Sequence, residues 1–208
     1  MSRPFALGGV IASVILIAIG IGSVVIGFNG RSEVRDQVKQ EQIAGTPDMT
    51  PAGIKKAANE AGLKNITFPT CSVAGKTVSD GATAKCFAQY MRIHALEATN
   101  GQVYAEMGRF LDKAGKPTND EAAAAKDPKS GQPVENGLRN LWVTETALTT
   151  ALNTSYFAEQ VALFSIVIGF ALLLVGIGFL VLTWSLLKSA TARAAEAVAP
   201  KTTAGAAA

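Results

Sequence analysis

One histidine and one nearby glutamate are the residues of this 208-residue chain best suited to metal binding or acid–base chemistry. His94 lies three residues before Glu97, so their side chains share one face of a predicted helix. A facial iron triad or a carboxylate-rich di-iron site needs more ligands than these two residues supply. The pattern is therefore more typical of a surface or interface histidine than of a metal centre.

Two further side chains, Tyr104 and Arg109, belong with His94 and Glu97 as candidates for the lining of a small ligand site. Ion pairing and polar contacts on helix surfaces explain these residues equally well. The ligand site requires that the four side chains meet in one pocket. We keep it as the alternative to a protein without a ligand.

The segment Gly75-Lys76-Thr77 matches the end of a phosphate-binding loop. That loop needs a glycine five residues before Gly75, and this position is Thr70. No G-x-S-x-G motif presents a nucleophilic serine either. We predict no catalytic residue, no metal ion and no cofactor.

The only two cysteines, Cys71 and Cys86, form a pair with none left over. This predicts a disulfide and an oxidising compartment. A bridge that closes a loop of about 15 residues contributes about 3 kcal/mol in the chain-entropy model. The alternative is two buried, unpaired thiols in a cytoplasmic domain. A four-ligand zinc site would need more ligands than two cysteines and one histidine.

Two long apolar stretches predict membrane-spanning helices over residues 5–28 and 158–187. From Val161 the second stretch has no charged residue for more than twenty positions, enough to cross a hydrocarbon layer of about 30 Å. The first stretch is also compatible with a signal peptide. Its length, its single preceding arginine and the lack of an A-x-A-like site favour an uncleaved anchor.

Small residues recur every seven positions in both spans. Such a stripe lets two helix backbones approach closely with a left-handed crossing. The simplest interpretation is an antiparallel hairpin in which the two stripes face each other. Two alternatives are that the seven-residue spacing arises by chance, or that a stripe faces another subunit. The stripes are Ala6, Ser13, Gly20 and Gly27 in the first span and Ala162, Gly169, Gly176 and Thr183 in the second.

Helical periodicity and capping residues divide the central segment into short elements. We expect helices over 31–43, 51–61, 82–99 and 102–114, an extended connector or one edge strand over 63–69, and a mobile polar loop over 116–137. From residue 138 a helix is expected to continue into the second span. The tail is predicted to be weakly helical at first and disordered beyond residue 200.

Charge and cysteines together predict the orientation. The segment 29–157 holds 15 of the 19 Lys and Arg and 14 of the 16 Asp and Glu, and its length makes these charges poor indicators of sidedness. The short ends are mildly basic, which favours the cytoplasm. The predicted organisation is a cytoplasmic N-terminus (1–4), a first span (5–28), an extracytoplasmic domain (29–157), a second span (158–187) and a disordered cytoplasmic tail (188–208).

The run CSVAGKTVSDGATAKCFAQYMRIHALEATNGQVYAEMGRF, with DMTP before it, resembles a group of actinobacterial two-span membrane proteins. The resemblance covers the central part of the loop and the layout of both spans. It implies a location in a bacterial plasma membrane and no mechanism. Sequences of this kind sometimes carry the label aromatic ring-opening dioxygenase, but a non-haem iron centre needs more ligands than one histidine provides.

The fold class expected is an all-α membrane protein, an antiparallel transmembrane hairpin with a mainly helical, disulfide-containing extracytoplasmic domain. The expected function is non-enzymatic, as an accessory, assembly or interaction partner of envelope membrane proteins. The expected partners are the lipid bilayer and other membrane proteins or a second copy. Nucleic acid is excluded as a partner, because the loop is nearly neutral and has no basic stripe with interleaved aromatic residues.

Overall fold

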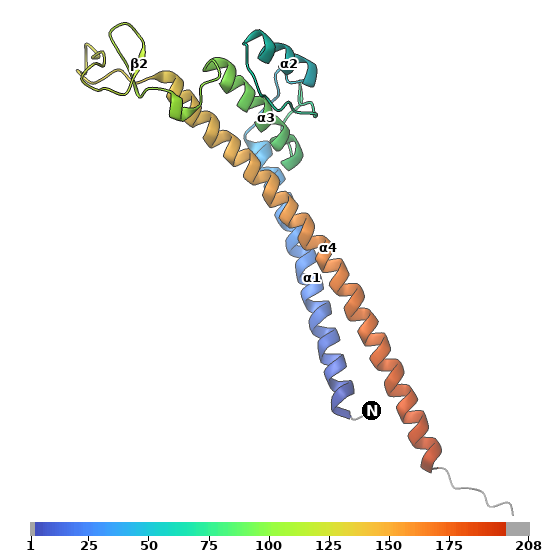
Figure 1. Cartoon of the computed structure of the whole chain (residues 1–208). Helices are drawn as coiled ribbons and strands as arrows, with labels where there is room; N and C mark the ends of the chain where they lie inside the picture. The colour runs from blue at the N-terminus through green and yellow to red at the C-terminus, as the bar shows by residue number, and fades with distance from the viewer. Residues whose placement is uncertain (1–2, 199–208) are drawn as a thin grey trace, which may run out of the picture. The chain divides into compact units, whose positions relative to one another are not determined.

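The computed structural model describes residues 3–198 and is mostly helical (Figure 1). The chain forms two compact units. The apolar unit contains the chain up to Asn29 and from Val161 onward, and the central unit is Gly30–Gln160. The elements in order are α1 (Arg3–Gln40), α2 (Pro51–Glu60), α3 (Gly81–Ala98), the 3₁₀ helix η1 (Tyr104–Glu106), strands β1 (Phe110–Leu111) and β2 (Pro117–Thr118), and α4 (Gly137–Val198).

In the apolar unit, α1 and α4 pack against each other in antiparallel directions. A Cβ atom added to Gly9 would meet Thr183, one added to Gly20 would meet Gly169, and one added to Gly27 would meet Ala162. As the residue number increases along α1, the residue number of its contact on α4 decreases, which is the pattern of two antiparallel helices. Both helices are long and apolar enough to cross a membrane.

Both long helices extend past the predicted ends of the spans. Helix α1 continues through Asn29 and Gly30, so the amphipathic segment predicted over 31–43 is the last part of α1 and ends at Gln40. Helix α4 runs to Val198, so residues 188–198 of the predicted tail are helical. Alanine has the highest helix propensity, and no proline lies between the start of α4 at Gly137 and Pro200. Residues 199–208 lie outside the described part of the chain.

The two short helices of the central unit begin at the predicted capping residues. Thr50 Oγ1 accepts a hydrogen bond from Gly53 N at 3.0 Å, with Pro51 at the first helical position. At the start of α3, Asp80 Oδ1 accepts from Thr83 N at 2.8 Å, and Thr83 Oγ1 accepts in return from Asp80 N at 3.1 Å. Burial raises the pKa of Asp80, but the hydrogen bonds from Thr83 and the charge of Arg35 outweigh it and lower that pKa overall.

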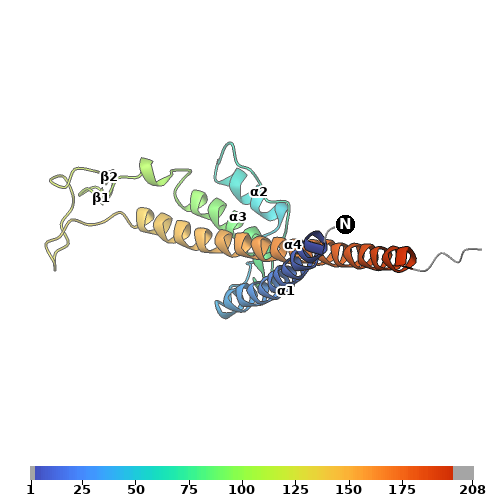
Figure 2. The same ribbon diagram turned by 90° about the horizontal axis from the view of Figure 1, so that it is seen from below.

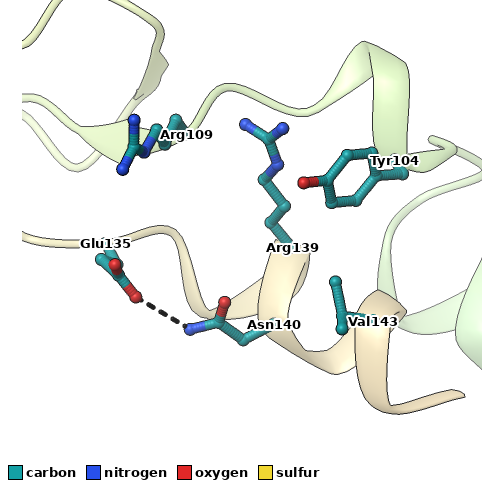
Figure 3. Close-up of a pocket in the computed structure, with 6 residues that line it drawn as sticks. All are labelled: Tyr104, Arg109, Glu135, Arg139, Asn140 and Val143. Carbon is teal, nitrogen blue, oxygen red and sulfur yellow. Dashed lines mark hydrogen bonds between the residues drawn. The ribbon is translucent and has the colours of Figure 1, made fainter. Parts of the chain in front are cut away.

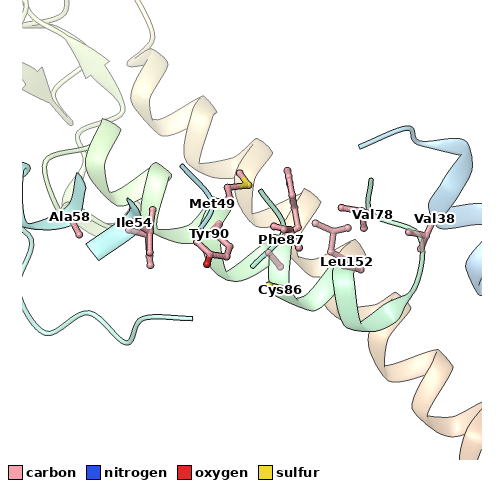
Figure 4. Packing of buried hydrophobic residues seen from close by; sticks show 13 residues of the cluster. Val38, Met49, Ile54, Ala58, Val78, Cys86, Phe87, Tyr90 and Leu152 are labelled. Atoms are coloured by element: carbon pink, nitrogen blue, oxygen red, sulfur yellow. The ribbon is translucent and has the colours of Figure 1, made fainter. Parts of the chain in front are cut away.

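The core of the central unit lies between α2, α3, the last turns of α1 and the N-terminal half of α4 (Figure 4). Figures 1 and 2 both show α3 beside this half of α4. The buried core includes Val38, Ile54, Phe87 and Leu152, one from each of these four helices. Residues from distant parts of the sequence thus share one hydrophobic cluster.

The predicted disulfide between Cys71 and Cys86 is present, with a Cα–Cα distance of 6.1 Å. It ties the connector after α2 to the first half of α3. Next to it, the fully buried Tyr90 donates its hydroxyl hydrogen to the Cys71 carbonyl oxygen at 2.6 Å. The segment 63–69 forms neither helix nor strand, so of the two predicted alternatives it is the connector and not an edge strand.

The prediction of a helix over 102–114 is wrong. The chain forms η1 there and then β1, which pairs antiparallel with β2. A Cβ atom on Gly108 would lie 2.5 Å from Thr118 N, so this close approach of two backbones needs glycine. The segment 116–137 is likewise held by backbone hydrogen bonds, with Ala125 N donating to Leu111 O and Val134 N to Ala125 O. The central unit is therefore mainly helical, as predicted, with a small β-ribbon that was not predicted.

Candidate functional site

A pocket of about 350 Å³ lies in the central unit where the η1–β1 segment meets the start of α4 (Figure 3). Its lining carries three charged side chains, two of them cationic. The lining residues are Tyr104, Arg109, Glu135, Arg139, Asn140 and Val143.

One buried residue, Asn136, holds the two sides of this pocket together. It is 2% exposed and precedes the first residue of α4. Its side-chain Oδ1 accepts from Leu138 N at 3.1 Å, which caps the helix. Its Nδ2 donates to Gly108 O and its backbone N to Arg109 O, both at 2.9 Å. The start of α4 and the segment that carries Arg109 are therefore fixed to each other.

The two guanidinium groups of the pocket each stack on an aromatic ring. Arg139 lies over the Tyr104 ring with its guanidinium carbon 4.1 Å from the centroid, and Arg109 lies over Phe110 at 5.0 Å. Within residues 6–193, neither arginine has a carboxylate within 4.0 Å. The pocket's own carboxylate, Glu135, instead accepts a hydrogen bond from Asn140 Nδ2 at 3.2 Å.

His94 and Glu97 form a separate cluster that does not line this pocket. His94 Nδ1 lies 2.8 Å from Glu97 Oε2, and Nε2 lies 3.1 Å from Asp48 Oδ2 in the loop before α2. A hydrogen bond with Thr46 lowers the pKa of Asp48, and the charge of His94 lowers it as well against an opposing effect of burial. Both ring nitrogens of the histidine face carboxylates, which links α3 to that loop.

The four predicted ligand-site residues therefore separate into two pairs. Tyr104 and Arg109 share the pocket at the start of α4, while His94 and Glu97 contact each other on α3. The pocket at the start of α4 thus takes in only two of the four side chains that the sequence suggested as one lining. Across the described residues, no three His, Cys, Asp or Glu side chains gather in a way that could hold a metal ion.

Glu159 is a buried carboxylate whose role the sequence did not indicate. It is 5% exposed, and its Oε1 accepts from Arg31 Nε at 2.8 Å and from Arg35 Nε at 2.9 Å. Its Oε2 accepts from Gly81 N, the first residue of α3, at 2.7 Å. A single side chain thus links α1, α3 and α4 within the central unit. The one available signal was the spacing of Arg31 and Arg35, one helical turn apart.

The small-residue stripes lie on the sides of α1 and α4 that face each other in the apolar unit. Ser13, Gly20, Gly27, Ala162, Gly169, Gly176 and Thr183 are buried, and Ala6 is half-buried. Among the described stripe residues, Gly20 and Gly169 meet each other, whereas a Cβ atom on Gly176 would meet Ile17 and Leu16. The Ser13 hydroxyl donates to Gly9 O in its own helix at 2.7 Å, which satisfies this buried polar group.

The central unit thus holds a pocket with two arginines, a cluster around Glu159 that joins α1, α3 and α4, and a cluster around His94 that joins α3 to the loop before α2. The pocket offers hydrogen-bond donors to a ligand, and the clusters use theirs within the protein. Comparisons of the chain with protein-family models, curated proteins and solved structures give no match.

Proposed function

We propose that the protein is a two-span integral membrane protein that serves as a non-enzymatic accessory or assembly partner of other envelope membrane proteins. The observation that carries this proposal is the uncovered apolar surface of the apolar unit. Phe164, Phe170 and Leu174 on α4 are among many large hydrophobic side chains there that remain exposed, Leu174 by 72%. Surfaces of this kind are stable only against lipid or other apolar helices.

The face of α4 that packs on α1 and the face that does not are chemically different. The packed face carries small residues such as Gly169 and Gly176, whereas the uncovered face carries phenylalanine and leucine. Helices associate in lipid by close van der Waals packing, and large aromatic side chains provide much contact area. The uncovered face of α4 is the surface on which we place a partner helix.

Photo-crosslinking in native membranes tests this surface with two adjacent leucines. Leu174 points away from α1, whereas the Leu173 side chain would lie 2.9 Å from a Cβ atom on Gly20. We expect a photoreactive residue at Leu174 to give adducts with other membrane proteins, identified by mass spectrometry. The same residue at Leu173 should give links within the chain. A photoreactive residue at Phe164 serves as a second position on the same face. If Leu174 and Phe164 both give adducts with lipid alone, this face has no protein partner and the proposal is wrong.

The proposed orientation places both termini in the cytoplasm and the central unit outside. The Cys71–Cys86 disulfide supports this orientation, because structural disulfides persist in oxidising compartments. We expect Ser130→Cys, in an exposed turn of the central unit, to react with a membrane-impermeant maleimide on intact cells. Ser189→Cys, exposed near the end of α4, should react only after permeabilisation. The opposite labelling pattern would show that the termini lie outside and the central unit in the cytoplasm.

A second candidate function is ligand binding by the central unit. The observation that favours it is the pocket at the start of α4, which brings Tyr104 and Arg109 together with Arg139. His94 and Glu97 no longer belong to this alternative, since they do not line that pocket.

A further inference from the structure

The pocket at the start of α4 has the chemistry of an anion site. We propose that it binds a small organic anion, with Arg109 and Arg139 holding a carboxylate or phosphate group. The proposal goes beyond the assembly role, because neither the uncovered face of α4 nor the disulfide contributes to it. The proposal assigns a class of ligand, small organic anions, to the central unit.

The charges of the lining favour an anion. The lining has two arginines, Arg109 and Arg139, against one acidic residue, Glu135, and neither arginine forms an ion pair with any residue in 6–193. Glu135 is engaged by Asn140 on the opposite side of the pocket from Tyr104, as Figure 3 shows. Two guanidinium groups therefore keep their hydrogen-bond donors free for a ligand.

Stacking on aromatic rings orients these guanidinium groups without using their donors. The carbon at the centre of each planar guanidinium group lies over a ring, 4.1 Å from the Tyr104 centroid for Arg139 and 5.0 Å from the Phe110 centroid for Arg109. The N–H bonds lie in that plane and point outward from its edge, which matches two oxygens of a carboxylate or phosphate. Side chains held this way lose less conformational entropy when the ligand binds.

The backbone adds to the same preference. The pocket lies at the N-terminus of α4, and Arg139 and Asn140 belong to the first turn of this helix. Helix N-termini carry a partial positive charge that stabilises bound anions. The phenol of Tyr104 and the side chain of Val143 complete the wall, which gives an organic group a surface to contact. A volume of about 350 Å³ is in the range of small-molecule sites.

Titration calorimetry on the full chain in an uncharged detergent tests the site, with succinate and inorganic phosphate as separate probes. We expect saturable one-to-one binding of at least one probe, weakened by added salt. Binding of succinate alone would assign the site to carboxylates, and binding of phosphate alone to phosphate groups. Arg109→Gln and Arg139→Gln should each weaken binding by about tenfold, the scale expected for one charged hydrogen-bond pair.

The control is Arg193→Gln, which removes the same charge from an exposed position near the end of α4 and should leave binding unchanged. Glu135→Gln keeps both guanidinium groups and removes the competing charge, so it should tighten binding about two- to fivefold. If the arginine variants fold poorly, the affinity of Glu135→Gln for the probe still tests whether the pocket binds an anion. The proposal is overturned if neither probe saturates, if Arg193→Gln weakens binding as much as the pocket variants, or if Glu135→Gln fails to tighten it.

Discussion

Gly169→Leu is expected to separate α1 from α4 in the apolar unit. A Cβ atom at this position would lie 2.6 Å from Val24 Cγ2, 2.8 Å from Gly20 O and 2.8 Å from Val24 N. Two of these three atoms belong to the backbone of α1 and cannot rotate away. Overpacking costs about 1 to 3 kcal/mol in cores whose side chains can adjust. We expect more than about 3 kcal/mol here, because the helices themselves must move apart.

A disulfide reporter at the other end of the helix pair measures this separation. A Cβ atom on Gly9 would lie 3.6 Å from Thr183 Cβ, within the range of about 3.5 to 4.5 Å found in disulfides. Gly9→Cys with Thr183→Cys should therefore crosslink on oxidation of the purified protein, as measured by the mass of the linked peptides. Adding Gly169→Leu should abolish most of the crosslink.

Gly178→Leu is the matched control for this experiment. It lies nine residues further along the same helix, it is exposed, and a Cβ atom there would meet no heavy atom within 4 Å. The crosslink should survive this substitution. If Gly169→Leu also leaves it intact, or if both leucines remove it equally, close packing at Gly169 does not hold the two helices together.

Glu159→Ala is expected to destabilise the central unit by about 2 to 3 kcal/mol. The substitution removes the acceptor of three hydrogen bonds and leaves Arg31, Arg35 and Gly81 N without their partner. Breaking a fully buried ion pair costs about 3 to 5 kcal/mol. The arginine side chains are 37% and 36% exposed, so water replaces part of the loss and the expected cost falls below that range, to about 2 to 3 kcal/mol.

Thermal unfolding in an uncharged detergent, followed by circular dichroism, measures this effect. Glu60→Ala is the control, because Glu60 pairs with Lys56 at 3.9 Å on an exposed helix surface and should change stability by less than about 0.5 kcal/mol. Glu159→Gln keeps the size of the side chain but removes the charge, and its stability should fall between wild type and Glu159→Ala. Equal stability of Glu159→Ala and Glu60→Ala would show that the cluster contributes nothing to folding.

Local patterns were enough to predict α2, α3 and the apolar parts of α1 and α4. The capping residues Thr50 and Asp80 lie where both short helices begin, because a cap acts on backbone groups within three residues. The disulfide was predictable for a different reason, since Cys71 and Cys86 leave only one possible pairing within the chain.

The segment after α3 shows where local patterns fail. Apolar residues at helical spacing predicted a helix over 102–114. In the structure Met107 and Phe110 are buried, but Met107 belongs to an irregular segment and Phe110 to the short strand β1. The competing contacts come from Thr118, Val134 and Glu135, which lie further along the chain. Hydrogen bonds to these residues outweighed a weak helix propensity.

By itself, the sequence determined the helical class, the two apolar stretches, the caps and the cysteine pair, because each depends on residue type or on neighbours a few positions away. Only the tertiary structure decided the position of Glu159, which is 128 residues from Arg31 and 78 from Gly81, and the pocket that Asn136 fixes by reaching back 28 residues to Gly108. Contacts over such separations depend on how the helices pack, and no periodicity in the chain encodes them.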